Sequence, residues 1–152
     1  MIDRHCGQNS VEDLGKNIWI ADKYCRLFLK NAFSEDGLNL AEGLTLMILY
    51  GGDGISQDDI IRSIHLDKGV MTRTITGLLD KGYIKKSKHP EDSRISLILL
   101  SEQGRAYRDR MNLVLRSWNE VILAGIDESD LAVANRVLVQ IKDHAMSWMS
   151  KD

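Results

Sequence analysis

Proline, aromatic residues and cysteine are all scarce in this chain of 152 residues, which has one proline, two phenylalanines, four tyrosines, three tryptophans and two cysteines. Few prolines and aromatics argue against a disordered chain and against a β-sandwich, and they favour helices. The hydrophobic share of 43% and the charged share of 28% are ordinary for a globular protein. We therefore expect one domain with a real core, with an added helical part.

Long apolar runs and an export signal are also missing. The longest runs, such as "LTLMILY" and "ISLILL", are far shorter than the roughly 18–20 residues of a membrane-spanning helix. The first ten residues, "MIDRHCGQNS", are polar and lack the apolar region of a secretory signal. We expect no membrane partner and a cytoplasmic location with reduced thiols. Cys25 lies on a helical apolar stripe and is expected to be a buried structural thiol, whereas Cys6 lies in a polar tail.

No residues are spaced for metal binding or catalysis. The cysteines form no CxxC pair, and the four histidines are scattered along the chain. Phosphate-binding glycine loops, the nucleophile elbow and HExxH are absent. The acidic pairs Asp58-Asp59 and Glu91-Asp92 are explained by a helix start and a turn. We expect no enzyme, no metal and no cofactor.

The charges are unevenly distributed, although the net charge is only −2. Residues 1–61 carry a net charge of −5, residues 62–116 a net charge of +6, and residues 117–152 a net charge of −3. A basic segment between acidic flanks is typical of a site that binds a polyanion. The alternative is a solvated, helix-rich surface that happens to be basic.

Long amphipathic helices are predicted at both ends of the chain. In residues 11–33 and 129–149, apolar side chains recur every three or four residues. Another long helix is expected from Arg105 to about Ala124, after an N-cap at Ser101. The core of one domain is too small to bury the apolar faces of all these helices.

Two short helices with a tight connection are predicted in the middle, after a buried helix in "LAEGLTLMILYGG". Ser56 is a good N-cap for the first of the two, with Asp59 three residues later. Asp67 can cap the second, and Gly82 can end it. The pair is a candidate helix-turn-helix.

The second helix of this pair, about residues 68–81, has an apolar and a polar face. The apolar face is expected to be core and holds Met71, Ile75, Leu78 and Leu79. The opposite face holds Gly69, Thr72, Arg73, Thr76 and Gly77, with Val70 at its edge. Arginine can bind guanine in a major groove, threonine can contact base edges, and glycine permits close backbone approach. The alternative is an ordinary exposed polar face.

A β-hairpin is predicted directly after this helix, in "KKSKHPEDSRISLILL". Its first strand carries three lysines that can reach phosphates, Lys85, Lys86 and Lys88. Pro90 sets the turn, and Asp92 can hold Arg94 in place at the tip. A narrow minor groove attracts such an arginine. The alternative is an ordinary hairpin with a Pro-Asp turn.

Together these residues resemble the MarR family of bacterial winged-helix transcription regulators. The resemblance covers roughly Leu14 to the end of the chain and is most specific in "TRTITGLLDKGYIKKSKHPEDSRISLILLSEQG". The matching motifs are Leu78 with Gly82, Asp92 with Arg94, and Leu100-Ser101 with Gly104.

The resemblance implies a mainly α fold with a small β-hairpin wing. In this fold a winged helix-turn-helix is flanked by N- and C-terminal dimerisation helices. Residues 37–101 would be the DNA-binding domain, and residues 1–36 and 102–152 the helical dimerisation region. The implied partners are a second copy, in a homodimer, and a pseudo-palindromic operator in double-stranded DNA. The half-sites should lie about one helical turn apart, roughly 10 bp.

The expected function is therefore a homodimeric, sequence-specific DNA-binding transcriptional regulator, a repressor, with helix 68–81 in the major groove and wing 83–100 in the minor groove. The residues expected to contact DNA are Ser56, Gln57, Lys68, Gly69, Thr72, Arg73, Thr76, Lys86, Lys88 and Arg94. Pro90 and Asp92 would support the wing. The alternative is a winged-helix protein-interaction module, suggested by the negative net charge and by Ser93 where many members have a second arginine.

A small aromatic ligand is the expected effector, because three tryptophans and Tyr24 on or near the long helices could line an apolar cleft. The resemblance also implies an effector pocket between the dimerisation and DNA-binding parts. Trp19 and Tyr24 lie on the first long helix and are candidates for lining it. The alternative is that the aromatic residues of the long helices belong to the core and to the dimer interface.

Overall fold

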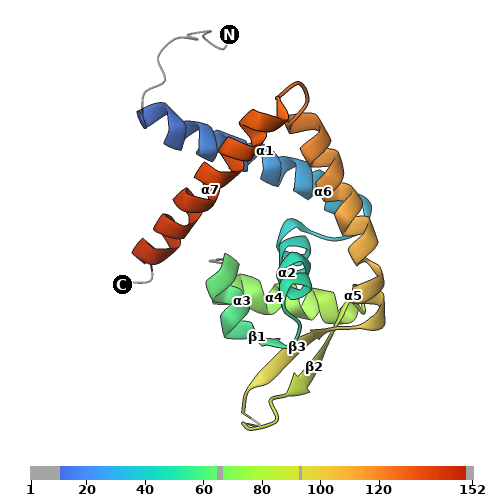
Figure 1. Cartoon of the computed structure of the whole chain (residues 1–152). Coiled ribbons are helices and arrows are strands. Elements are labelled where there is room, and N and C mark those ends of the chain that lie inside the picture. Colours follow the sequence, from blue (N-terminus) through green and yellow to red (C-terminus); the bar gives the residue numbers. More distant parts are fainter. Residues whose placement is uncertain (1–10, 65–66, 93, 150–152) are drawn as a thin grey trace. The chain divides into compact units, whose positions relative to one another are not determined.

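The computed structural model describes residues 11–64, 67–92 and 94–149, and the side chains from Asp13 onward. The expectations on Cys6, Ser93 and the connection at His65-Leu66 lie outside the described residues. The elements are α1 (Val11–Glu35), α2 (Leu40–Gly51), β1 (Ile55–Ser56), α3 (Gln57–Ile64), α4 (Lys68–Asp80), β2 (Ile84–Lys88), β3 (Ser96–Leu100), α5 (Glu102–Ala106), α6 (Arg108–Ile122) and α7 (Glu128–Met149) (Figure 1).

The expected fold class is confirmed, since the chain is mainly helical with a small antiparallel sheet in the order β1-β3-β2. Two details differ from the sequence-based expectation. The two-residue strand β1 pairs Ile55 with Ile98 and was not expected. The long helix expected after Ser101 is divided at Tyr107 into α5 and α6. The Tyr107 hydroxyl donates to Asp36 Oδ2 at 2.7 Å, so a contact with a distant segment holds this residue.

The helix caps predicted from the sequence are present. Ser56 Oγ accepts from the Asp59 amide at 3.2 Å. Asp67 Oδ1 accepts from the amides of Gly69 and Val70 at 2.7 and 3.2 Å, which satisfies two free donors at the start of α4. Ser101 Oγ accepts from the Gly104 amide at 3.0 Å. These bonds fix where the helices of the helix-turn-helix and the helix after the wing begin.

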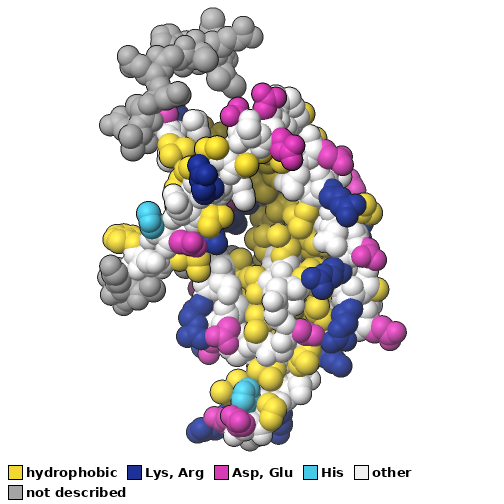
Figure 2. All heavy atoms as spheres, in the orientation of Figure 1, with side chains coloured by type: hydrophobic (Ala, Val, Ile, Leu, Met, Phe, Trp, Pro, Cys, Tyr) yellow, Lys and Arg dark blue, Asp and Glu magenta, His cyan; other side chains and the backbone are white. Residues whose placement is uncertain are grey.

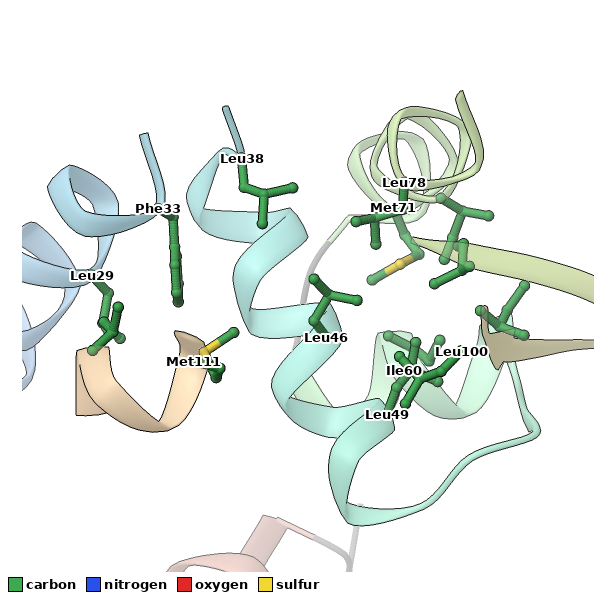
Figure 3. Packing of buried hydrophobic residues seen from close by; sticks show 14 residues of the cluster. Leu29, Phe33, Leu38, Leu46, Leu49, Ile60, Met71, Leu78, Leu100 and Met111 are labelled. Atoms are coloured by element: carbon green, nitrogen blue, oxygen red, sulfur yellow. The ribbon is translucent and has the colours of Figure 1, made fainter. Parts of the chain in front are cut away.

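One hydrophobic core joins the helix-turn-helix to the sheet and to the end of α1. Figure 3 shows side chains from α1, α2, α3, α4, α6 and β3 pointing toward one another. The buried members are Leu29, Phe33, Leu38, Leu46, Leu49, Ile60, Met71, Ile75, Leu78, Ile84, Ile98, Leu100, Met111 and Val114. Burial of this apolar area is the main force that holds α4 and the wing in place.

The chain forms two compact units, one ending at Leu115 and one beginning at Arg116. The first unit includes the buried Leu29 and Phe33 of α1, which lie in the segment 1–36 that was expected to belong to the helical dimerisation region. In the second unit, α7 has no buried residue among those described. No helix in the described part of the chain is long and apolar enough to cross a membrane.

Candidate nucleic-acid interface

The α4 helix presents a polar face to solvent because its apolar face is anchored in the core. Met71, Ile75 and Leu78 are buried, as the helical periodicity predicts. The exposed positions of this face are occupied by Gly69, Thr72, Arg73 and Thr76. Arg73 makes no hydrogen bond or ion pair with the described residues. Its five donors are therefore available to a ligand.

A hydrogen bond joins the start of α3 to this exposed face. Gln57 Nε2 donates to Thr72 Oγ1 at 3.3 Å, and Thr72 Oγ1 in turn donates to the Lys68 carbonyl at 2.9 Å. Ser56 lies beside Gln57 and caps α3. Residues expected to contact DNA from two helices therefore share one surface.

Gly77 does not belong to this surface, which corrects the expectation from the helical wheel. A Cβ at Gly77 would lie 2.3 Å from Glu42 Oε1. The buried Glu42 carboxylate accepts from Lys81 Nζ at 2.6 Å and from the Asn39 amide at 2.8 Å. Gly77 is thus explained by the close approach of α2, where α4 must leave room for the buried Glu42 carboxylate that pairs with Lys81.

The wing is the hairpin of β2 and β3, paired from Ile84 with Leu100 to Lys88 with Ser96. Ile84 is buried, and the remaining residues of β2 are exposed. The side chains of Lys86 and Lys88 therefore project into solvent, as expected for residues that reach phosphates.

Asp92 holds Arg94 at the tip of the wing. Arg94 Nε donates to Asp92 Oδ1 at 3.0 Å, and Arg94 Nη2 donates to Asp92 Oδ2 at 2.9 Å. The Asp92 pKa is lowered, first by the side-chain hydrogen bond from Arg94 and then by the bond from the Arg94 amide. The pair is therefore charged at neutral pH, and it is lost only in acid, as the pH falls through the lowered pKa. The Arg94 side chain is 89% exposed, so pairing orients it without hiding it.

A groove of about 750 Å³ separates the tip of the wing from the start of the helix-turn-helix. It is lined by Ser56, Gln57, Lys68 and Arg94, which were expected to contact DNA. Strand β1 brings these residues together, because its pairing with β3 ties the start of α3 to the wing. A strand of two residues has no detectable periodicity, so the sequence carried no signal for this juxtaposition.

Four other charged or titratable side chains line this groove and were not expected to contact DNA: Asp58, Asp59, Arg62 and His89. From the sequence, Asp58 and Asp59 were assigned only to a helix start. Asp59 accepts from Ser56 Oγ at 2.6 Å and pairs with Arg62. The hydrogen bond from Ser56, and then that from Arg62, lowers the Asp59 pKa. Figure 2 shows basic and acidic side chains interspersed over α3 and the wing. Arg62 therefore offsets the negative charge of α3 that faces the groove.

The residues considered for other roles lie elsewhere. The side chains of Trp19 and Tyr24 are exposed on α1, and neither lines the groove beside the wing. Cys25 is half-buried, and burial followed by the charge of Asp22 raises its thiol pKa, which favours the less reactive protonated form. Within the described residues, no three histidine, cysteine or acidic side chains gather to hold a metal ion.

The comparisons with known proteins agree with this geometry. The model of the MarR family matches residues 38–96. The HTH-type transcriptional regulator BilQ of Clostridium symbiosum is 26% identical over 106 residues, which are 68% of this chain and 72% of that protein. The uncharacterized HTH-type transcriptional regulator YdgJ of Bacillus subtilis is 24% identical over 86% of this chain and 88% of that protein.

Solved structures establish the fold over nearly the whole chain. The MarR transcriptional regulator from Methanosarcina mazei Go1 superposes with a TM-score of 0.79 at 24% identity, covering 92% of this chain and 94% of that one. The transcriptional regulator SlyA superposes with a TM-score of 0.80 at 21% identity, covering 92% and 99%.

A helix-turn-helix followed by a β-hairpin with a basic strand and an arginine at its tip defines a winged-helix protein. The family match covers the parts that form this surface, from α2 to the start of β3. Residues 38–96 thus match the MarR family model, and the chain is similar to proteins named HTH-type transcriptional regulators.

Proposed function

We propose that the protein is a homodimeric repressor that binds a pseudo-palindromic operator, with α4 in the major groove and the wing in the adjacent minor groove. The observation that carries the proposal is the groove that Ser56, Gln57 and Lys68 share with Arg94. It joins the starts of α3 and α4 to the tip of the wing. A bound dimer would repress by excluding polymerase from the DNA that it covers.

Arg73 is the residue best suited to read a base from α4. It is exposed on the face opposite the core, one residue from Thr72, which hydrogen-bonds Gln57. An arginine that donates both terminal nitrogens to guanine O6 and N7 distinguishes this base in the major groove. The wing lysines and Arg94 would instead contact phosphates and the minor groove, which positions the helix.

Arg73→Ala is expected to weaken operator binding by about 1–3 kcal/mol at each half-site and to relax the preference at one base pair. The measurement is fluorescence anisotropy with a duplex that wild type selects from a random-sequence pool, in a salt series, beside a scrambled duplex. Arg73→Lys is the control, because it keeps the charge but loses the bidentate geometry. Equal, weak binding of both duplexes by wild type would contradict the proposal and favour a protein-interaction module.

The exposed apolar side chains of the second unit support a homodimer. They lie at the end of α6, in the following loop and along α7: Val121, Ile122, Leu123, Ile126, Val133, Val137, Leu138, Val139, Met146, Trp148 and Met149. Apolar surface on this scale marks an interaction site in a globular protein. A second copy of the chain buries such a surface symmetrically, and a two-fold dimer matches a palindromic operator.

Leu138→Glu is expected to convert the dimer to a monomer, because the Leu138 side chain, 48% exposed in the single chain, would be buried between copies. Sedimentation velocity measures the change, and operator affinity should fall with it. Gln140→Glu, on the same helix, is the matched control, since it adds the same charge at a polar position. A Leu138→Glu protein that remains dimeric would exclude this face of α7 from the interface.

Release by a small aromatic ligand stays a prediction from the sequence. The side chains of Trp19 and Tyr24, which were expected to line the effector pocket, are exposed on α1.

A further inference from the structure

His89 occupies a defined position at the base of the wing tip. It follows the last residue of β2, and its amide donates to the Ile95 carbonyl at 2.9 Å, which closes the turn. Its side chain is half-buried and lines the groove together with Arg94 and Lys68. The backbone pairing of the wing therefore fixes where this ring stands, at the edge of the candidate DNA surface.

The hydrogen bonds of His89 determine which ring nitrogen carries the proton. His89 Nδ1 accepts from the Glu91 amide at 3.2 Å. A neutral imidazole that accepts at one nitrogen donates at the other. The Nε2–H group is therefore the donor. No acceptor for it is found within the described residues, although the ring lines a groove.

The charges around the ring favour an anionic acceptor. Arg62 of α3, Lys68 of α4 and Arg94 of the wing face the same groove. Asp59 pairs with Arg62 and Asp92 pairs with Arg94, so the charges within each pair offset one another. Asp58 also lines the groove, whereas Lys68 makes no ion pair with the described residues. A phosphate that approached the exposed Arg94 guanidinium would thus meet the Lys68 ammonium group and one free N–H donor in the same groove.

We infer that His89 is a further DNA-contacting residue, which donates its Nε2–H to a phosphate oxygen beside the minor groove that Arg94 enters. Arg94 is 89% exposed at the tip and would reach into the minor groove, whereas the half-buried His89 ring lines the groove beside it and would meet the outer edge of the duplex. The contact rests on the proposed DNA-binding function. The His89 contact would add affinity for DNA and would fix the position of the wing on the DNA backbone. It would not distinguish one base from another, because phosphates carry no sequence information.

Two substitutions separate the roles of the two ring nitrogens. His89→Asn keeps an acceptor where Nδ1 stands, since an asparagine side chain accepts from the amide two residues later, but it has no donor at the Nε2 position. His89→Gln places an amide N–H near the Nε2 position and loses the acceptor for the Glu91 amide. If His89 contacts DNA, His89→Gln should bind DNA more tightly than His89→Asn. If His89 only supports the turn, the order of the two affinities should be reversed.

The measurement is the affinity of the full-length chain for a fluorescein-labelled duplex that wild type selects from a random-sequence pool. His89→Asn is expected to raise Kd about fivefold to tenfold at each half-site, the usual net effect of one hydrogen bond. His89→Gln should remain within about twofold of wild type. The slope of binding against salt should not change for His89→Asn, because a neutral donor releases no counterion.

Other outcomes overturn the inference. If His89→Gln loses affinity and melting temperature while His89→Asn keeps both, His89 only supports the turn. If both variants bind DNA with wild-type affinity, His89 makes no contact with DNA. In that case the proposed function still stands, provided that the wild-type protein binds the selected duplex in a salt-dependent way. Failure of wild type to bind either the selected duplex or a scrambled one refutes the proposed function, and the His89 contact with it.

Discussion

Gly104→Ala is expected to lower the free energy of unfolding by about 3 kcal/mol, at the upper end of the usual cost of overpacking. A Cβ at Gly104 would lie 2.0 Å from the Tyr83 carbonyl oxygen and 3.2 Å from Leu100 Cδ2. The first obstacle is backbone, which cannot rotate away as a flexible side chain can. The same carbonyl accepts from the Ser101 amide at 3.0 Å, so any shift also disturbs the start of α5.

Urea unfolding followed by circular dichroism measures this effect. Gly15→Ala in α1 is the matched control, because no atom lies within 4 Å of its added Cβ. In a helix interior this replacement is expected to stabilise the protein by up to about 1 kcal/mol. If the free energy of unfolding of Gly104→Ala lay within about 0.5 kcal/mol of the wild-type value, the close approach of the Tyr83 carbonyl to α5 would not be a constraint.

Arg94→Ala is expected to weaken operator binding about tenfold or more for each wing, and thus about a hundredfold for a dimer with two independent wings. Arg94 is oriented by two side-chain hydrogen bonds to Asp92. A narrow minor groove concentrates negative potential, so a fixed arginine loses little freedom when it enters. The slope of the logarithm of affinity against that of salt concentration should fall by about 2, one per lost cation.

Arg26→Ala is the control for this experiment. Arg26 also pairs with an aspartate on the surface, donating to Asp22 Oδ2 at 2.8 Å, but it lies on α1, away from the wing. The Arg26→Ala protein should bind DNA with the same affinity as wild type. The melting temperature of Arg94→Ala should not change, since the side chain is exposed and packs against no core residue. Unchanged affinity in Arg94→Ala would remove the wing tip from the interface.

Local interactions explain why much of the site could be predicted. The caps at Ser56, Asp67 and Ser101 form bonds that span two or three residues, so residue type and spacing predict them. The Asp92–Arg94 pair is equally local. The exposure of Thr72 follows from the helical repeat of the apolar residues around it.

Contacts between distant segments decided the rest. A helical wheel placed Gly77 on the exposed face, but it cannot show that α2 brings the Glu42 carboxylate against this position. Likewise, the contact of Tyr107 with Asp36 spans more than seventy residues, and it stands where one predicted helix becomes two. Such contacts depend on the packing of whole elements, which periodicity within one element does not contain.

The sequence by itself therefore determined the winged-helix class, the polar face of α4 and the arginine at the wing tip, because each depends on short-range spacing. The tertiary structure decided which of these residues share a surface. Pairing of β1 with β3 brings the start of α3 to the wing and creates the groove. The hydrogen bond of the His89 ring with the Glu91 amide is local, but the groove that this ring lines forms only where α3 and α4 face the wing.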